Sequence, residues 1–129
     1  MTQDITMWGK TITFTKDFGS WHSVLDKQQL KLACEARMES GECISSFLAR
    51  QSVQPNAIHE VPIPAHGITL YNLATEQWVA LPVWKCLAIP VVIDRVPSRL
   101  KFLIVEDSIT WAVLGADNIR NVDTGALPA

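Results

Sequence analysis

The sequence lacks the features that mark several common functional classes. Its three cysteines, Cys34, Cys43 and Cys86, include no CxxC pair. An odd number without short spacing argues against a disulfide framework, so we expect reduced thiols and a cytoplasmic protein. The eleven Lys and Arg residues are scattered, and the net charge is −2 at pH 7. Because phosphate binding needs clustered basic residues, nucleic acid is not favoured as a partner.

Long hydrophobic runs and phosphate-binding loops are also missing. The longest apolar stretch, Trp78 to Ile93, is interrupted by two prolines and a lysine, and it is too broken for a membrane span. No apolar segment near the start resembles a signal peptide. No glycine-rich loop is present, so nucleotide hydrolysis is not expected. We therefore expect no membrane association and no cofactor.

Apolar residues are abundant, making up 48% of the 129 positions. This composition predicts a large core or an apolar surface buried against a partner, and a homodimer is the simplest such partner. Five tryptophans stand against one tyrosine, and tryptophan is enriched at interfaces and binding surfaces. The length fits a single domain over residues 1–129.

The order of apolar patterns predicts an α+β domain. After a frayed start over Met1–Asp4, residues Met7–Thr15 alternate as a half-buried strand. Ser23 and Asp26 resemble a capping box that opens a helical segment over about residues 24–53, with helices near 24–38 and 43–51. The segment from about 68 to 115 is β-rich. We expect a mainly antiparallel sheet or small barrel, with the helical pair inserted after the first strand.

The stretch Leu100–Ile119 is the predicted centre of the fold. It contains two buried strands, Leu100–Val105 and Ile109–Leu114, rich in β-branched and apolar residues. Gly115 and the residues after it indicate a tight turn that leads into a short helix.

Asp17 is the candidate catalytic residue. It follows the alternating strand, at a strand-to-turn junction where a carboxylate can be held between two subunits. Two carboxylates that lie close together share one proton, so one can act as a base and the other as an acid. A dimer with two-fold symmetry needs only one such Asp in each chain.

Two stretches resemble the retropepsin type of aspartic protease, the small dimeric kind found in retroviruses and retrotransposons. Thr13–Leu25, TFTKDFGSWHSVL, is similar to the family's strand ending in Asp-Thr/Ser-Gly-Ala/Ser. Phe102–Ile119 is similar to its closing pattern of two strands, Gly, x-Asp and a short helix. Between them, Ile68–Leu81 would occupy the flap region. The resemblance implies a homodimer with Asp17 in the catalytic role.

The chain departs from that family pattern in two ways. Phe18 stands where the family carries the Thr or Ser whose hydroxyl braces the paired active-site loops, so a catalytically inactive relative stays open. The helical stretch Asp26–Val53 is also longer than usual for the family. A literal Asp-Thr-Gly match at Asp123–Gly125 is followed by only a few residues, and we interpret it as part of a tail.

Two other interpretations remain. Ser40–Glu60 resembles a helix-turn-helix whose second helix would start at Pro55 and present Asn56 and His59 to DNA, although two helices packed on a sheet fit better. The chain could also be a non-enzymatic accessory protein that binds a peptide, a protein or a small molecule. Its ligand surface would then contain Tyr71, Trp78, Trp84 and Trp111, which could equally be core residues. The histidines and cysteines lack ligand spacing, so no metal site is expected.

Overall fold

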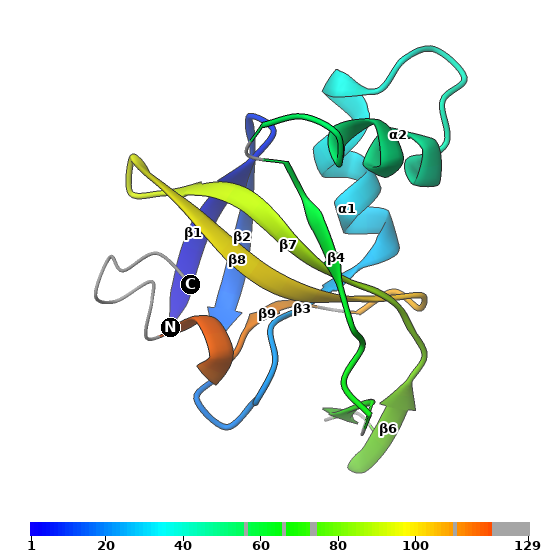
Figure 1. Ribbon diagram of the computed structural model, residues 1–129. Coiled ribbons are helices and arrows are strands. Elements are labelled where there is room, and N and C mark those ends of the chain that lie inside the picture. The colour runs from blue at the N-terminus through cyan, green and yellow to red at the C-terminus, as the bar shows by residue number, and fades with distance from the viewer. Residues whose placement is uncertain (56, 66, 73–74, 110, 120–129) are drawn as a thin grey trace.

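The computed structural model describes residues 1–55, 57–65, 67–72, 75–109 and 111–119. It is mostly β, with short helices between the third and fourth strands (Figure 1). The elements in chain order are β1 (Thr2–Met7), β2 (Lys10–Lys16), β3 (Val24–Asp26), α1 (Lys27–Cys34), the 3-10 helix η1 (Glu35–Arg37), α2 (Ile44–Gln51), β4 (His59–Val61), β5 (Ile68–Asn72), β6 (Gln77–Leu81), β7 (Val83–Ile93), β8 (Val96–Val105) and β9 (Ala112–Leu114). Residues 116–119 form a helical turn directly after β9.

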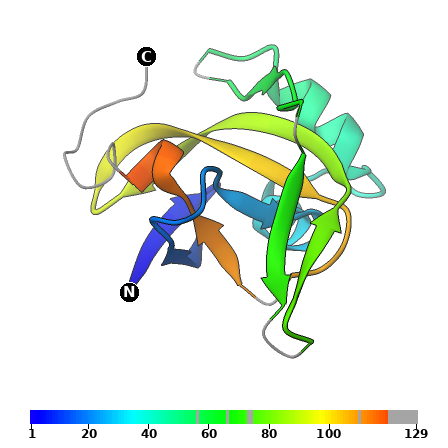
Figure 2. The ribbon, with the colours of Figure 1, turned by 90° about the horizontal axis from the view of Figure 1, so that it is seen from below.

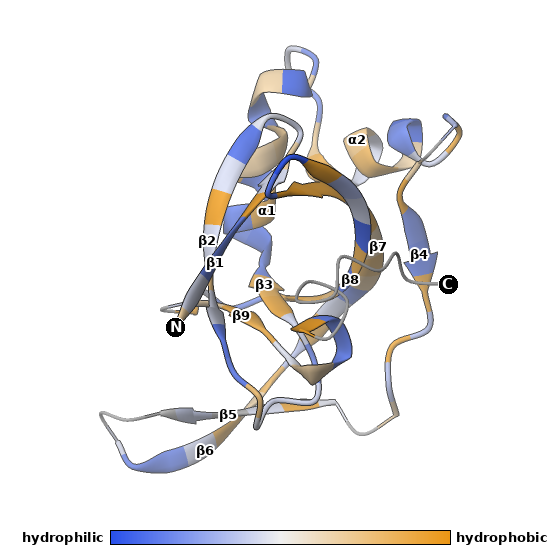
Figure 3. Ribbon diagram, turned by 90° about the vertical axis from the view of Figure 1, so that its left-hand side faces the viewer, coloured by the Kyte–Doolittle hydropathy of each residue, from blue (hydrophilic) through white to orange (hydrophobic). Residues whose placement is uncertain are grey.

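Among the described residues, six strands form a closed ring in the order β1-β2-β9-β3-β8-β7 (Figure 3). The ring closes where Thr6 of β1 pairs with Val92 of β7. The short strand β4 pairs with another part of β7. Strands β5 and β6 form a separate hairpin that projects from one end of the ring.

The sheet is mixed, so the expected small barrel is present but a mainly antiparallel sheet is not confirmed. β2 pairs with β9, and β3 with β8, in parallel. The β1–β2, β7–β8, β4–β7 and β3–β9 pairings are antiparallel. The parallel pairing of β2 with β9 places the end of β9 beside the end of β2, and this arrangement brings the closing segment of the chain to Asp17.

The start of the chain differs from the sequence prediction. Residues 2–7 form β1 instead of a frayed tail, and the expected strand Met7–Thr15 is divided by a turn. Trp8 and Gly9 both have positive φ, 50° and 79°, as a two-residue hairpin turn requires. Because β1 and β2 precede β3, the helical pair follows the third strand, and its expected place after the first strand is not confirmed.

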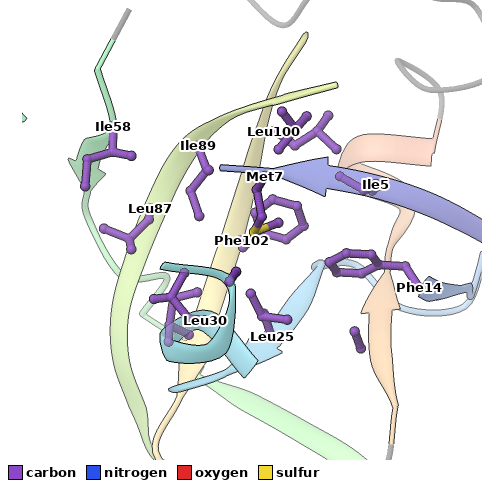
Figure 4. Packing of buried hydrophobic residues seen from close by; sticks show 14 of the residues in the cluster. Ile5, Met7, Phe14, Leu25, Leu30, Ile58, Leu87, Ile89, Leu100 and Phe102 are labelled. Atoms are coloured by element: carbon purple, nitrogen blue, oxygen red, sulfur yellow. The ribbon is translucent and has the colours of Figure 1, made fainter. Parts of the chain in front are cut away.

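Buried apolar side chains fill the ring (Figure 4). Phe14 of β2 stacks on Phe102 of β8, with ring centroids 5.3 Å apart. Leu30 of α1 and Phe47 of α2 belong to the same cluster, so both helices pack their apolar faces against the barrel. A face of this kind gives a short helix most of its stability.

The connection between α1 and α2 is fastened by an ion pair. Arg50 donates from Nη2 to Oε1 of Glu42 at 2.8 Å and from Nε to Oε2 at 3.0 Å. Arg50 Nη2 also donates to the carbonyl oxygen of Arg37. The hydrogen bonds from Arg50, followed by the one from the backbone N–H of Glu39, lower the pKa of Glu42 to about 2.

Replacing Glu42→Gln should therefore have a pH-dependent effect on stability. The folded pKa lies below the ordinary value of 4.5, so the ion pair stabilises the fold fully above that value and is lost as pH falls towards about 2. The difference in Tm between wild type and Glu42→Gln should thus shrink across this window. Thermal unfolding followed by circular dichroism measures it, and Glu35→Gln, an exposed position on η1, is the control. A Tm difference that is constant from pH 7 to pH 2 would contradict the assignment.

Candidate active site

Asp17 lies at the end of β2, in the loop of residues 17–23 that leads to β3. Its backbone N–H donates to the carbonyl oxygen of Leu114 on β9 at 2.9 Å. Its carboxylate Oδ1 accepts the N–H of Gly19 at 2.9 Å, and its carbonyl oxygen accepts the N–H of Ser20 at 3.1 Å. These hydrogen bonds hold the Asp17 carboxylate in the turn, and the Asp17 side chain stays exposed to solvent.

The segment after β9 lies directly against this loop. A Cβ on Gly115 would overlap the carbonyl of His22 and lie 2.9 Å from the carbonyl oxygen of Ser20. The N–H of Ala116 donates to that same oxygen of Ser20 at 2.7 Å. Only glycine permits two backbones to approach so closely, which explains why the closing segment needs Gly115.

The hydroxyl of Ser23 links the two segments and is fully buried. Its Oγ accepts the N–H of Gly115 at 2.9 Å and Nδ2–H of Asn118 at 2.8 Å. It donates in turn to Oδ1 of Asp117 at 2.8 Å. A serine hydroxyl has one proton and two lone pairs, so this arrangement uses its full capacity.

Asn118 extends the network to β8. Its Nδ2 donates to the carbonyl oxygen of Lys101 at 2.7 Å, and its Oδ1 accepts the N–H of Lys101 at 3.4 Å. Asn118 is 2% exposed, so losing these partners would leave a buried amide without hydrogen bonds. The Asp17 loop, the helical turn at 116–119 and β8 therefore form one hydrogen-bonded unit.

Sequence analysis assigned Ser23 to a helix cap, and this was wrong. Asp26 is itself the N-cap of α1, because its Oδ1 accepts the N–H of Gln29 at 2.7 Å. Its Oδ2 accepts the N–H of Ile109 at 3.1 Å. The strand expected over Ile109–Leu114 is β9, Ala112–Leu114, in the structure. Sequence analysis missed Ser23 and Asn118 as site residues because their partners are distant in the sequence. Ser23 and Asn118 are 95 positions apart, and Asn118 and Lys101 are 17 positions apart.

Two of the four candidate binding aromatics lie together on the β5–β6 hairpin. The rings of Tyr71 and Trp78 meet edge to face, with centroids 5.2 Å apart, and both are exposed. The hairpin projects from the same end of the barrel as the 17–23 loop (Figures 1 and 3). Figure 2 shows the molecule from that end.

The other two aromatics have different surroundings. Trp84 on β7 is partly buried against the main core. Nζ of Lys27 lies 4.3 Å and Nζ of Lys85 lies 5.1 Å from the centroid of its ring. Trp111 precedes β9 and is exposed. No ring contact among the described residues joins either of them to the Tyr71–Trp78 pair.

The described residues after Pro55 do not form the second helix of a helix-turn-helix, so the DNA-binding interpretation was wrong on this point. Asn56 lies outside the described residues, but Ala57 and Ile58 are not helical and His59 starts β4. Arg50, a basic residue within the stretch Ser40–Glu60, is paired with Glu42.

Three further expectations concern metals, membranes and the end of the chain. Within the described ranges, no three His, Cys, Asp or Glu side chains are grouped so that they could hold a metal ion, and His66 lies outside those ranges. The helices that the structure describes include none with the length and apolar character to cross a membrane. The Asp-Thr-Gly match at Asp123–Gly125 lies outside the described residues.

Comparison with known proteins gives structural relatives only. No protein-family model and no curated protein sequence matches the chain. The structure of EIAV protease in complex with the inhibitor HBY-793 superposes with a TM-score of 0.52 at 12% identity, covering 100% of this chain and 91% of that one. The retroviral protease-like domain of Ddi1 from Leishmania major gives 0.49 at 11% identity, covering 94% and 75%. The first comparison confirms a retropepsin-like fold.

The close approach at Gly115 leads to a stability prediction. Gly115→Ala should lower the free energy of unfolding by about 2–3 kcal/mol, because its Cβ meets fixed backbone atoms that must shift. Gly41→Ala is the matched control, since Gly41 has φ +75° but no atom within 4 Å of the added Cβ, and it should cost only about 1 kcal/mol. Urea unfolding measures both changes. Equal losses in the two variants would contradict the tight crossing.

Proposed function

We propose that this chain is a retropepsin-like aspartic endopeptidase that acts as a homodimer, with one Asp17 from each copy forming the catalytic pair. The observation that carries the proposal is the position of Asp17, exposed at the end of β2 on a loop whose backbone is held by Gly115 and Ser23. The retropepsin-like fold supports the same function, because a solved structure of similar fold is a protease.

A symmetric pair of Asp17 carboxyl groups could hydrolyse a peptide bond. Two carboxylates in contact cannot both ionise readily, so one keeps its proton. The ionised group takes a proton from a water molecule, whose oxygen attacks the peptide carbonyl carbon, while the other group donates its proton to the carbonyl oxygen. The resulting diol collapses with cleavage of the C–N bond, and the nitrogen leaves as an amine after receiving a proton from the pair.

The hydrogen bond from Gly19 prepares Asp17 for this role. It occupies Oδ1 at 2.9 Å and sets the plane of the carboxylate. The other oxygen, Oδ2, is then the atom that meets water or the partner copy. Orientation of this kind lowers the barrier because little rearrangement remains when the substrate binds.

The β5–β6 hairpin is the proposed cover for a bound peptide. It carries the exposed Tyr71 and Trp78 and projects from the end of the barrel that holds the Asp17 loop. Its base is anchored by a second apolar cluster that includes Ile68, Val24 and Leu103. Aromatic rings on such a hairpin suit a peptide with apolar side chains.

One observation favours a second candidate, a catalytically inactive relative that binds peptides as the same dimer. Phe18 brings an apolar ring to the position next to Asp17 and offers no side-chain hydroxyl to brace the paired loops. The inactive relative would keep the dimer and the hairpin surface but would not cleave.

Replacing Asp17→Asn should abolish cleavage while leaving the dimer and the fold intact. An amide can neither ionise nor share the proton, so we expect a loss of at least about 100-fold in kcat/KM. The assay measures hydrolysis of a denatured casein or peptide library between pH 4 and 7, with mass determined by size-exclusion chromatography and light scattering. Asp94→Asn is the control, because Asp94 lies in the β7–β8 turn at φ +49°, which asparagine accepts.

The possible results separate the two candidates. Cleavage lost only in Asp17→Asn supports the peptidase. A wild-type dimer that binds peptides without cleaving them points to the inactive relative. Equal cleavage by wild type and Asp17→Asn removes Asp17 from the chemistry, and a monomer without peptide binding excludes both candidates.

A further inference from the structure

The loop that holds Asp17 exposes two large apolar side chains. Phe18 is 66% exposed and Trp21 is 82% exposed. We infer that Phe18, with Trp21 of the same loop, packs against a second copy of this chain, so that an apolar contact holds the two Asp17 loops together. This inference rests on the proposed function, because it assumes that the two copies meet at Asp17.

The exposure of Phe18 belongs to a fixed part of the backbone. The turn is closed by the bond from Ser20 N–H to the Asp17 carbonyl oxygen and by that from Gly19 N–H to the Asp17 carboxylate. Ser20 is held in turn by Ala116, and its hydroxyl donates to the carbonyl oxygen of His22 at 2.7 Å. A loop fastened at these points cannot readily turn its apolar side chains inward, so both stay on the surface and are available to a partner.

Symmetry determines where Phe18 would lie in the dimer. Consecutive Cα atoms are about 3.8 Å apart, so a residue next to Asp17 is close to any axis on which two Asp17 side chains meet. Residues near a two-fold axis contact their own copies in the partner. The two Phe18 rings would therefore face each other, and paired aromatic rings are favourable beyond the area that they bury.

The charge of the loop fits a second copy better than a strongly charged partner. Between residues 17 and 23 the chain carries no Lys, Arg or Glu, and Asp17 is the only carboxylate. When two copies meet, the only repulsion inside this loop contact comes from the Asp17 pair, which is relieved by one shared proton. A peptide substrate is the competing occupant of the rings, and the experiments below separate the two.

A cysteine cross-link tests the contact directly. In the full chain with Cys43→Ser, which removes the exposed cysteine, Phe18→Cys should form a disulfide-linked dimer under mild oxidation. A disulfide needs Cα atoms within about 7 Å, so it forms only near the axis. Val53→Cys in the same background is the control, because Val53 is 83% exposed and follows α2. A linked dimer of Phe18→Cys alone supports the inference, and equal linking of both variants overturns it.

Sedimentation equilibrium provides the second test. Phe18→Ala should weaken the dimer at least about 10-fold, whereas Val53→Ala should leave its dissociation constant unchanged. If Phe18→Ala does not weaken the dimer, the inference is overturned. The same holds if this variant loses peptide binding but keeps the dimer. Loss of cleavage in Asp17→Asn would then still uphold the proposed peptidase. A dimer weakened by Phe18→Ala in a chain that does not cleave supports the contact without the catalysis, and a wild type that stays monomeric overturns both.

Discussion

The close crossing of two backbones at Gly115 is the constraint on which the rest of the site depends. The residue lies against the carbonyl groups of Ser20 and His22, which are more than ninety positions earlier in the chain. With no side chain between them, the buried hydroxyl of Ser23 can reach the N–H of Gly115 and the carboxylate of Asp117. The loop that presents Asp17 is therefore held from the side of the barrel, and its position does not rely on the loop's own turn alone.

The closed sheet makes this crossing possible. The parallel pairing of β2 with β9 puts Lys16 opposite Leu114, so the residues that follow the two strands leave the barrel side by side. The parallel pairing of β3 with β8 puts Val24, which follows the Asp17 loop, beside Leu103. Asn118 then fastens the helical turn to Lys101 on β8. Four strands thus converge on one polar cluster at the edge of an apolar core, and the cluster is stable because its buried groups are paired.

The departures from the retropepsin pattern have a physical meaning in this arrangement. The helical pair packs on the main core through residues such as Leu30 and Phe47, and the Arg50–Glu42 ion pair fastens its connection. It therefore adds to the barrel core, whereas the close contacts of Gly115 are with Ser20 and His22. Phe18 changes the surface next to the carboxylate, where an apolar ring replaces a hydroxyl. Phe18 is exposed in the single chain, so the fold of one copy does not depend on burying its ring.

The sequence alone determined the features that depend on neighbouring residues. Alternation placed Asp17 at a strand end, Gly115 indicated a turn before a short helix, and apolar stripes gave both α1 and α2. It did not show the hairpin turn at Trp8, because Trp8-Gly9 is not one of the Asn-Gly or Asp-Gly pairs that mark such a turn in a sequence. Tertiary structure alone decided that Ser23 serves the network instead of a helix cap, and that Ala57 and Ile58, described after Pro55, lead into a strand instead of a DNA-binding helix. Those outcomes depend on strands paired far apart in the chain, and a local pattern carries no record of its distant partner.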